Sequence, residues 1–235
     1  MRLDRYVAEA AGVTRSEAKN LLQKGRVRLN GVVCKKGETQ CAPTDTVQVD
    51  GVTAGRQQFV YIMLNKPQGV VSASEDRRDT TVVDLVQKDF PRRQLFPAGR
   101  LDKTSTGFVL ITDDGGFAHD ILSPRHHVDK TYRVELDAPV TEAVREAFAR
   151  GVTLADGQTL DPAEIEPLTA DGRTARVVLH QGVYHQIKRM LGVYGIGVNG
   201  LHRLAVGPVQ LDEGLAPGQW RQLTEAELAA LKSRV

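Results

Sequence analysis

The chain has 235 residues, of which 41% are hydrophobic and 26% charged, with 22 glycines and 10 prolines. This is the composition of an ordinary globular protein, and it excludes a collagen-like, low-complexity or disulfide-rich chain. The longest apolar run, residues 59–64, is far shorter than the roughly 18 residues of a membrane span. The charged start of the chain leads into no apolar segment of a secretory signal. We therefore expect a cytoplasmic protein that does not associate with membranes.

The net charge of +2 identifies no partner, but its distribution is uneven. Residues 1–50 hold nine Lys or Arg and six Asp or Glu, whereas the remaining residues hold 22 and 23. The small N-terminal part is therefore the basic part. The two cysteines, Cys34 and Cys41, form no CxxC pair, so we expect neither a zinc site nor a disulfide framework, and two reduced thiols.

The first 50 residues predict a module of two helices and a hairpin. Apolar residues from 3 to 10 repeat at helical spacing. A capping box at residues 14–17 is expected to begin a second helix, which ends at Gly25. The dipeptide Asn-Gly at 30–31 joins two alternating runs, a pattern that favours a type I′ hairpin turn. Residues 46–49 predict one more short strand.

The rest of the chain is predicted to be a short linker and one large domain. Residues 51–58 hold two glycines and almost no apolar side chains, which predicts a flexible linker. Residues 59–235 are expected to form an α+β domain. Because strands and helices do not alternate regularly, we expect a mostly antiparallel sheet flanked by helices, not a doubly wound parallel sheet. The strand candidates are 59–64, 108–112, 130–136, 163–168, 174–180 and 205–211, and the helix candidates are 81–88, 116–122, 141–150, 185–194 and 224–232. The last of these helices is expected to begin with a second capping box, at residues 224–227.

Basic side chains gather on the second helix and the hairpin of the N-terminal module. Such a cluster is either a solvated charged face or a surface that meets phosphates. The segment 1–50, notably RLDRY at 2–6, SEA at 16–18 and GRVRLNG at 25–31, resembles an S4 domain, a small RNA-binding module. This resemblance implies RNA contacts from Arg2, Arg15, Lys19, Lys24, Arg26 and Arg28.

One loop of the large domain combines Pro, Gly and reactive side chains. Residues 96–107 (FPAGRLDKTSTG) place Asp102 just before a buried strand candidate, where a rigid sheet can fix its position. On these residues alone, Asp102 and Arg100 are either an ion pair that holds the loop or part of a reactive site. Tyr132, on another strand candidate, is either a packing residue or a stacking surface for a base. An Asp, a Tyr and a cation could together hold a planar base and react at a sugar carbon.

Five segments of the chain, in this order, resemble the pseudouridine synthases of the branch that carries an S4 domain. They are 64–69 (LNKPQG), 99–107 (GRLDKTSTG), 130–132 (KTY), 185–190 (HQIKRM) and 201–203 (LHR). The resemblance assigns five roles. It implies that Asp102 is the essential carboxylate, that Tyr132 packs on the base, that Lys188 pairs with the Asp, that Arg100 helps to hold the target nucleotide out of its stack, and that Leu201 lines the pocket.

The resemblance also implies the reaction and its partner. The N1–C1′ bond of a uridine breaks, the uracil turns, and C5 bonds to C1′, with no cofactor and no metal. Segments 64–69 and 123–132 are most similar to relatives that act on 16S ribosomal RNA, which implies a site of the uridine-516 type. The substrate is then 16S rRNA, naked or in a partly assembled small subunit, and the enzyme is expected to be a monomer.

Three other interpretations stay open at this point. The first is a large-subunit (23S) rRNA synthase with the same mechanism, and the second is a non-catalytic S4 assembly factor. The third is a metal-dependent hydrolase built on His119, His126 and His127. Adjacent histidines in a strand point to opposite faces and do not easily share one ion, which disfavours the third. His185 is interpreted as a residue that orders its loop and not as a metal ligand.

Overall fold

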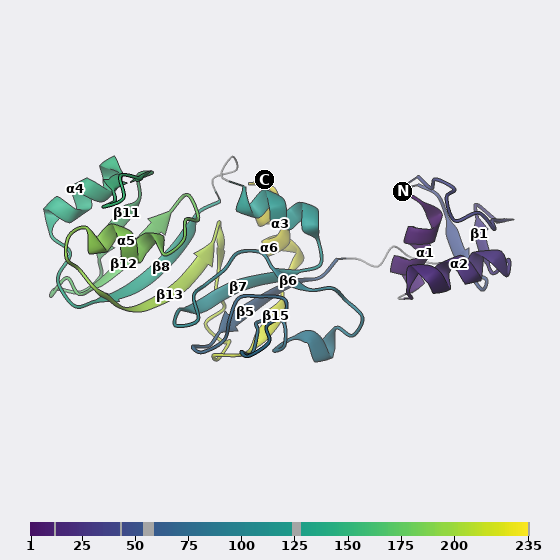
Figure 1. The fold of residues 1–235 in the computed structure, drawn as a ribbon, viewed down its shortest axis with the longest axis horizontal. Helices are drawn as coiled ribbons and strands as arrows, with labels where there is room; N and C mark the ends of the chain where they lie inside the picture. Colours follow the sequence, from purple (N-terminus) through teal and green to yellow (C-terminus); the bar gives the residue numbers. More distant parts are fainter. Residues whose placement is uncertain (12, 43, 54–58, 124–127, 235) are drawn as a thin grey trace. The chain divides into compact units, whose positions relative to one another are not determined.

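The computed structural model describes residues 1–235 except 12, 43, 54–58, 124–127 and 235. The chain divides into two compact units, Met1–Phe59 and Val60–Val235 (Figure 1). The predicted linker 51–58 starts too early, because Val52 and Thr53 form a strand of the first unit, and residues 54–58 lie outside the described residues. Among the described residues, no helix is both long and apolar enough to cross a lipid bilayer.

The first unit packs two helices against a four-stranded sheet in the order β2-β1-β3-β4. The predicted capping box is confirmed, with the Thr14 hydroxyl accepting from the Glu17 amide and the Glu17 carboxylate accepting from the Thr14 amide. The hairpin turn is also confirmed, because Asn30 and Gly31 both have positive φ, 52° and 83°. The elements are α1 (Leu3–Ala11), α2 (Arg15–Gln23), β1 (Val27–Leu29), β2 (Val32–Val33), β3 (Val47–Val49) and β4 (Val52–Thr53).

The second unit is built on one large sheet with the order β11-β12-β8-β13-β7-β5-β15, in which β14 also pairs with β13 and β6 with β7. Only the β13–β7 pair is parallel among the described strands of this sheet, so the expected mostly antiparallel α+β class is confirmed. The strands are β5 (Tyr61–Lys66), β6 (Phe96–Pro97), β7 (Thr106–Thr112), β8 (Lys130–Leu136), β11 (Glu164–Pro167), β12 (Thr174–Leu179), β13 (Val198–Val206), β14 (Val209–Gln210) and β15 (Trp220–Gln222); β9 (Val152–Thr153) and β10 (Thr159–Leu160) form a separate pair.

Each face of the large sheet buries a hydrophobic core. Side chains alternate along β5, so Ile62 belongs to one core and Met63 to the other. Helices α4 (Glu142–Arg150) and α5 (Gln186–Gly192) contribute to the first core, and α3 (Gly115–Leu122) and α6 (Glu225–Lys232) to the second. Figure 1 shows α3 and α6 near β6 and β7, with α4 and α5 beside β8, β11 and β12. Burial on both faces explains why every residue of β5 is buried.

Two of the predicted elements are wrong. Residues 81–88 form turns and only the start of a 3-10 helix, η1 (Gln87–Asp89), because Thr81, Val82 and Val83 are β-branched and disfavour a helix. Val82, Val83 and Val86 still pack into the first core, so the apolar residues of this segment are spaced as they would be in a helix. The candidate 205–211 is not one strand, because a turn at Gly207, whose φ is 54°, separates β13 from β14.

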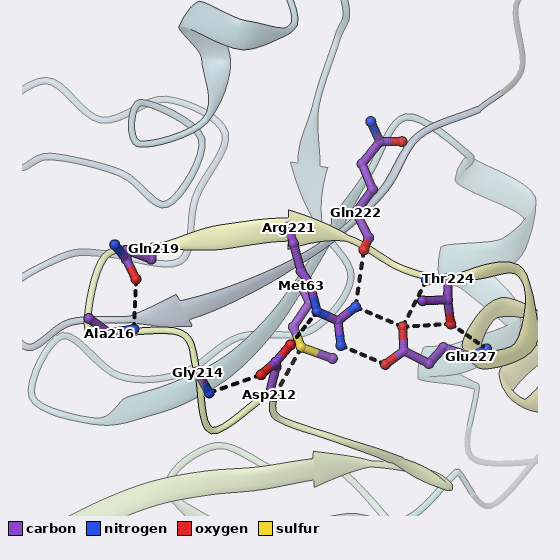
Figure 2. A network of polar contacts seen from close by, with 9 residues as sticks. All are labelled: Met63, Asp212, Gly214, Ala216, Gln219, Arg221, Gln222, Thr224 and Glu227. Carbon is purple, nitrogen blue, oxygen red and sulfur yellow. Dashed lines mark hydrogen bonds and ion pairs between the residues drawn. The ribbon is translucent and has the colours of Figure 1, made fainter.

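An ion-pair network fastens the C-terminal helix to the edge of the sheet (Figure 2). Arg221 on β15 donates to Asp212 at 2.6 Å and to both carboxylate oxygens of Glu227 at 2.8 and 2.7 Å. Glu227 also accepts from the Thr224 amide, which completes the second predicted capping box. Hydrogen bonds from Arg221 lower the pKa of Glu227 to about 2. Every charge in this network therefore has an opposite charge beside it.

Candidate active site

The motif-bearing segments meet around one cavity of about 640 Å³ in the second unit. The loop between β6 and β7 forms one wall, and β8, β13 and the segment that enters α5 form others. All five residues to which the resemblance assigns roles in catalysis or base binding line this cavity: Arg100, Asp102, Tyr132, Lys188 and Leu201. Segments up to 101 residues apart in the sequence thus contribute to one site.

Asp102 is held between two basic side chains. Its Oδ2 lies 3.4 Å from Lys188 Nζ, and its Oδ1 lies 3.1 Å from His185 Nε2. The loop closes behind it because the Ser105 amide donates to the Asp102 carbonyl at 3.0 Å. The side chain of Asp102 is 32% exposed, so it is reachable from the cavity. A carboxylate fixed by two basic groups and open to a cavity can react with a ligand bound there.

Gly107 is required where the loop enters β7. Its φ is 100°, and a Cβ at this position would lie 2.4 Å from the Arg203 carbonyl oxygen on the parallel neighbour β13. Only glycine permits this close approach of two backbones. The last glycine of the GRLDKTSTG segment therefore sets the distance between the Asp102 loop and β13.

Lys66, at the end of β5, holds the Asp102 loop by hydrogen bonds to its backbone. It is fully buried, and its Nζ donates to the carbonyls of Ser105 at 2.6 Å, Pro67 at 3.1 Å and Lys103 at 3.4 Å. Burial lowers the pKa of Lys66 to about 8; Asp102 opposes this shift and Arg203 adds to it. Sequence reasoning assigned no role to Lys66, although a lysine that ends an apolar strand was a usable signal.

Tyr132 and Leu201 form the apolar part of the cavity wall. Tyr132 lies on β8 and is only 8% exposed, and Leu201 lies on the adjacent β13 and packs against the same core. Tyr132 is therefore a core residue that also reaches the cavity, and its stacking on a base stays a prediction. A planar base can lie against such an apolar wall.

His185 was interpreted from the sequence as a loop-ordering residue, and the structure brings it to the carboxylate itself. It precedes α5 with a φ of 51°, a left-handed conformation that is uncommon for a non-glycine residue. Its ring stacks on Tyr184 with 3.8 Å between the centroids. This conformation points the imidazole toward Asp102, whereas Arg100 is exposed and, among the described residues, no ion pair joins it to Asp102. The alternative of an Arg100–Asp102 ion pair is therefore wrong.

Each of the two units matches a known protein family. Residues 60–192 match the model of the RNA pseudouridylate synthase family, and residues 1–47 match the S4 domain. The chain belongs to the RNA pseudouridylate synthase family. It is 40% identical to the ribosomal small subunit pseudouridine synthase A of Escherichia coli K12, over 98% of this chain and all of the relative.

Two further relatives support the family over the full length. An uncharacterised RNA pseudouridine synthase, YtzG of Bacillus subtilis, is 42% identical over 98% of both chains. A crystal structure of a pseudouridylate synthase superposes with a TM-score of 0.69 at 38% identity, covering 98% of this chain and 99% of the other. The protein is thus a pseudouridine synthase, and a non-catalytic assembly factor is excluded.

The six basic residues assigned to RNA contact in the S4 unit are all exposed, but they differ in their partners. Arg2 and Arg15 both bind the buried carboxylate of Asp4, and the Arg2 hydrogen bond is the main reason that the pKa of Asp4 falls to about 2. Arg26 is paired with Asp50, and Arg28 donates to the Gly31 carbonyl. Within the described part of the chain, no ion pair engages Lys19 or Lys24. These two lysines are therefore the most available for phosphates.

The histidines of the metal-hydrolase interpretation do not form a site in the described residues. His119 lies on α3, and His126 and His127 lie outside the described residues. Among the residues that the structure describes, no three His, Cys, Asp or Glu side chains are grouped so that they could hold a metal ion.

Proposed function

We propose that this pseudouridine synthase converts one uridine of 16S ribosomal RNA to pseudouridine, at a site of the uridine-516 type. The observation that carries the reaction is the position of Asp102, fixed by Lys188 and His185 in the cavity that Tyr132 and Leu201 line. The small-subunit substrate is supported by relatives such as those of Escherichia coli and Haemophilus influenzae, each about 40% identical and named ribosomal small subunit pseudouridine synthase A. The alternative is a 23S rRNA substrate.

Asp102 provides the carboxylate on which cleavage of the N1–C1′ bond depends. Lys188 and His185 hold its two oxygens in place, so the carboxylate is oriented before the substrate arrives. After cleavage, the uracil turns against Tyr132 and Leu201, C5 bonds to C1′, C5 loses its proton and N1 gains one. No atom is gained or lost overall. A single carboxylate suffices, unlike the pair of a glycosidase, because the released base is recaptured in the same cavity.

The target uridine must leave its helix to reach this cavity, which costs a few kcal/mol of unstacking. Arg100, which is exposed at the cavity wall, contacts the RNA strand and helps to hold the target nucleotide out of its stack. Lys19, Lys24 and Arg28 of the S4 unit contact phosphates elsewhere on the RNA, and these contacts offset the unstacking cost and set the register. The enzyme acts as a monomer in the cytoplasm, on 16S rRNA alone or in a partly assembled small subunit.

The decisive experiment maps pseudouridines in 16S and 23S rRNA from cells with the gene, without it, and with an Asp102→Asn copy. We expect one 16S pseudouridine to disappear in the deletion and in the Asp102→Asn strain, and to return with the wild-type gene. Loss of a 23S pseudouridine instead would identify the large-subunit rRNA as the substrate. Modification that persists in the Asp102→Asn strain would contradict the role of this carboxylate.

A further inference from the structure

Two buried cations, Arg203 and Lys130, line the cavity at its junction with the sheet and are not explained by the roles above. Arg203 is 3% exposed and Lys130 is 9% exposed. Neither forms an ion pair with a carboxylate in the described part of the chain. Charged groups are rarely buried without a partner, because the loss of hydration is then not compensated.

Arg203 has more hydrogen-bond donors than the fold uses. Its Nε donates to the Phe108 carbonyl at 2.6 Å, which fixes the side chain against β7. Its Nη2 is buried and has no hydrogen-bond partner among the residues that the structure describes. Its Nη1 lies near Gly99, another residue that lines the cavity, where an added Cβ would be 3.9 Å away. The Nε side of the guanidinium is therefore fixed by a hydrogen bond, whereas the Nη2 side has N–H donors that the fold does not use.

Lys130 lies close enough to Arg203 for the two charges to oppose each other. Burial is the largest cause that lowers the pKa of Lys130 to about 8, and repulsion from Arg203 is the second. The adjacent carboxylate of Asp129 opposes this shift, but it is hydrogen-bonded to His180 Nδ1 at 2.6 Å. No hydrogen bond satisfies Lys130 Nζ within the residues described. The cavity thus holds two neighbouring cations that lack an anion.

The sheet register places these cations beside the site for the base. Arg203 pairs with Tyr132 across β13 and β8, so the two side chains share a face. Lys130 and Leu201 lie two residues along their strands from Tyr132 and Arg203, on that same face. The face therefore presents an apolar pair, Tyr132 and Leu201, and a cationic pair, Lys130 and Arg203, about 7 Å apart along the strand. A nucleotide likewise has an apolar face on its base and an anion on its sugar.

We propose that Arg203 and Lys130 bind a phosphate of the RNA strand next to the flipped uridine. A phosphate supplies both the charge that the cations lack and acceptors for the spare guanidinium donors. A uracil carbonyl offers acceptors but no full charge, so it would not compensate the burial of two cations. This proposal rests on the base-binding cavity of the proposed function but not on which ribosomal RNA is the substrate.

The test measures binding of uridine, uridine 3′-monophosphate and uridine 5′-monophosphate to the full-length protein by calorimetry. We expect one monophosphate to bind at least about tenfold more tightly than uridine, since a charge-assisted hydrogen bond contributes about 1.5–3 kcal/mol. In Lys130→Met and Arg203→Lys this preference should shrink at least about threefold, while the affinity for uridine stays unchanged. Whichever monophosphate is preferred identifies the phosphate that is held.

Two controls keep the test decisive. Arg133→Gln removes a cation from the exposed face of β8 and should leave all three affinities unchanged. Lys130→Met replaces the lysine by an apolar side chain of similar length, so it stays informative even if Arg203→Lys does not fold. Equal binding of uridine and both monophosphates by the wild type would overturn the proposal, as would an equal loss of uridine and monophosphate affinity in Lys130→Met. Neither outcome depends on the ribosomal RNA target.

Discussion

Two arginines on strands of the same sheet have opposite surroundings. Arg221 on β15 is hydrogen-bonded to two carboxylates, Asp212 and Glu227, and joins a strand to a helix (Figure 2). Arg203 on β13 is more deeply buried, yet its only hydrogen-bond acceptor among the described residues is one backbone carbonyl. Removing one partner of a paired charge destabilises the fold because the other partner is left uncompensated, whereas a charge left unpaired beside a cavity costs stability and is available to a ligand. Changes near Arg221 should therefore affect stability, and changes around the cavity should affect activity or binding.

The largest expected effect is on the reaction itself. Asp102→Asn should lower the rate of pseudouridine formation by at least about 10³-fold, because the amide keeps the shape of the side chain and loses its charge. The melting temperature should change little, since the side chain is only partly buried. Single-turnover kinetics measures the rate. The matched variant Asp212→Asn should show the reverse pattern, with a small loss of stability and unchanged kinetics. If both variants changed the rate and the stability in the same way, the distinction between cavity residues and paired charges would be contradicted.

The second effect concerns the stability cost of Lys130. A lysine whose folded pKa is near 8 gives up its proton before the unfolded chain does, so the wild-type protein gains stability as pH rises from 8 toward 10.5. Lys130→Met should therefore be more stable than the wild type by up to about 3 kcal/mol at pH 7, and this difference should fall to about 1 kcal/mol at pH 10. Urea denaturation at both pH values measures it. A destabilised variant, or a constant difference, would contradict this account.

The third effect concerns the paired arginine. Arg221→Gln should reduce the free energy of unfolding by about 2 kcal/mol at pH 7, because Glu227 and Asp212 lose their counterion. The lowered pKa of Glu227 stabilises the wild type above about pH 4.5, and this contribution disappears as pH falls toward 2. The stability difference should therefore narrow in acid, which denaturation at pH 7 and pH 3 tests. Activity below the melting temperature should be retained.

The smallest effect extends the comparison to the S4 unit. Lys19→Gln with Lys24→Gln should lower RNA affinity severalfold and reduce the slope of log affinity against log salt by about 1 to 2, since each phosphate contact contributes roughly 0.7–0.9 to that slope. Arg5→Gln is the control, because Arg5 is already paired with Glu9 at 2.7 Å. RNA binding measured at several salt concentrations distinguishes the double lysine variant from the Arg5→Gln control. Equal slopes in the wild type and the double variant would remove these lysines from the RNA interface.

Local signals in the sequence predicted well because they involve residues only a few positions apart. Both capping boxes and the Asn30-Gly31 turn have the expected conformations. The helix expected at 81–88 failed because its spacing of apolar residues came from packing into the core, while three successive β-branched residues disfavoured the helix itself. Periodicity indicates which side chains are buried, and it does not by itself distinguish a helix from a series of turns that buries the same residues.

Resemblance to a family identified the residues around the cavity but not all their partners. Asp102 and Lys188 are 86 positions apart, and their contact depends on where the sheet brings the loop and α5 together. Lys66 and His185 were assigned lesser roles or none, because nothing in the neighbouring residues indicates three carbonyl acceptors around one amine or a left-handed backbone beside the carboxylate. Such contacts link segments that are distant in the sequence.

The sequence by itself determined the two-part organisation, the α+β class and the loop that carries Asp102, since these follow from composition and from motifs of a few residues. Only the tertiary structure decided which charges are paired and which are not. Pairing depends on strand register and burial, and the sheet sets both across about a hundred residues. For this reason two residues of the same type differ in the structure. Arg221 lies between two carboxylates, whereas Arg203 lies at a cavity that a phosphate can enter.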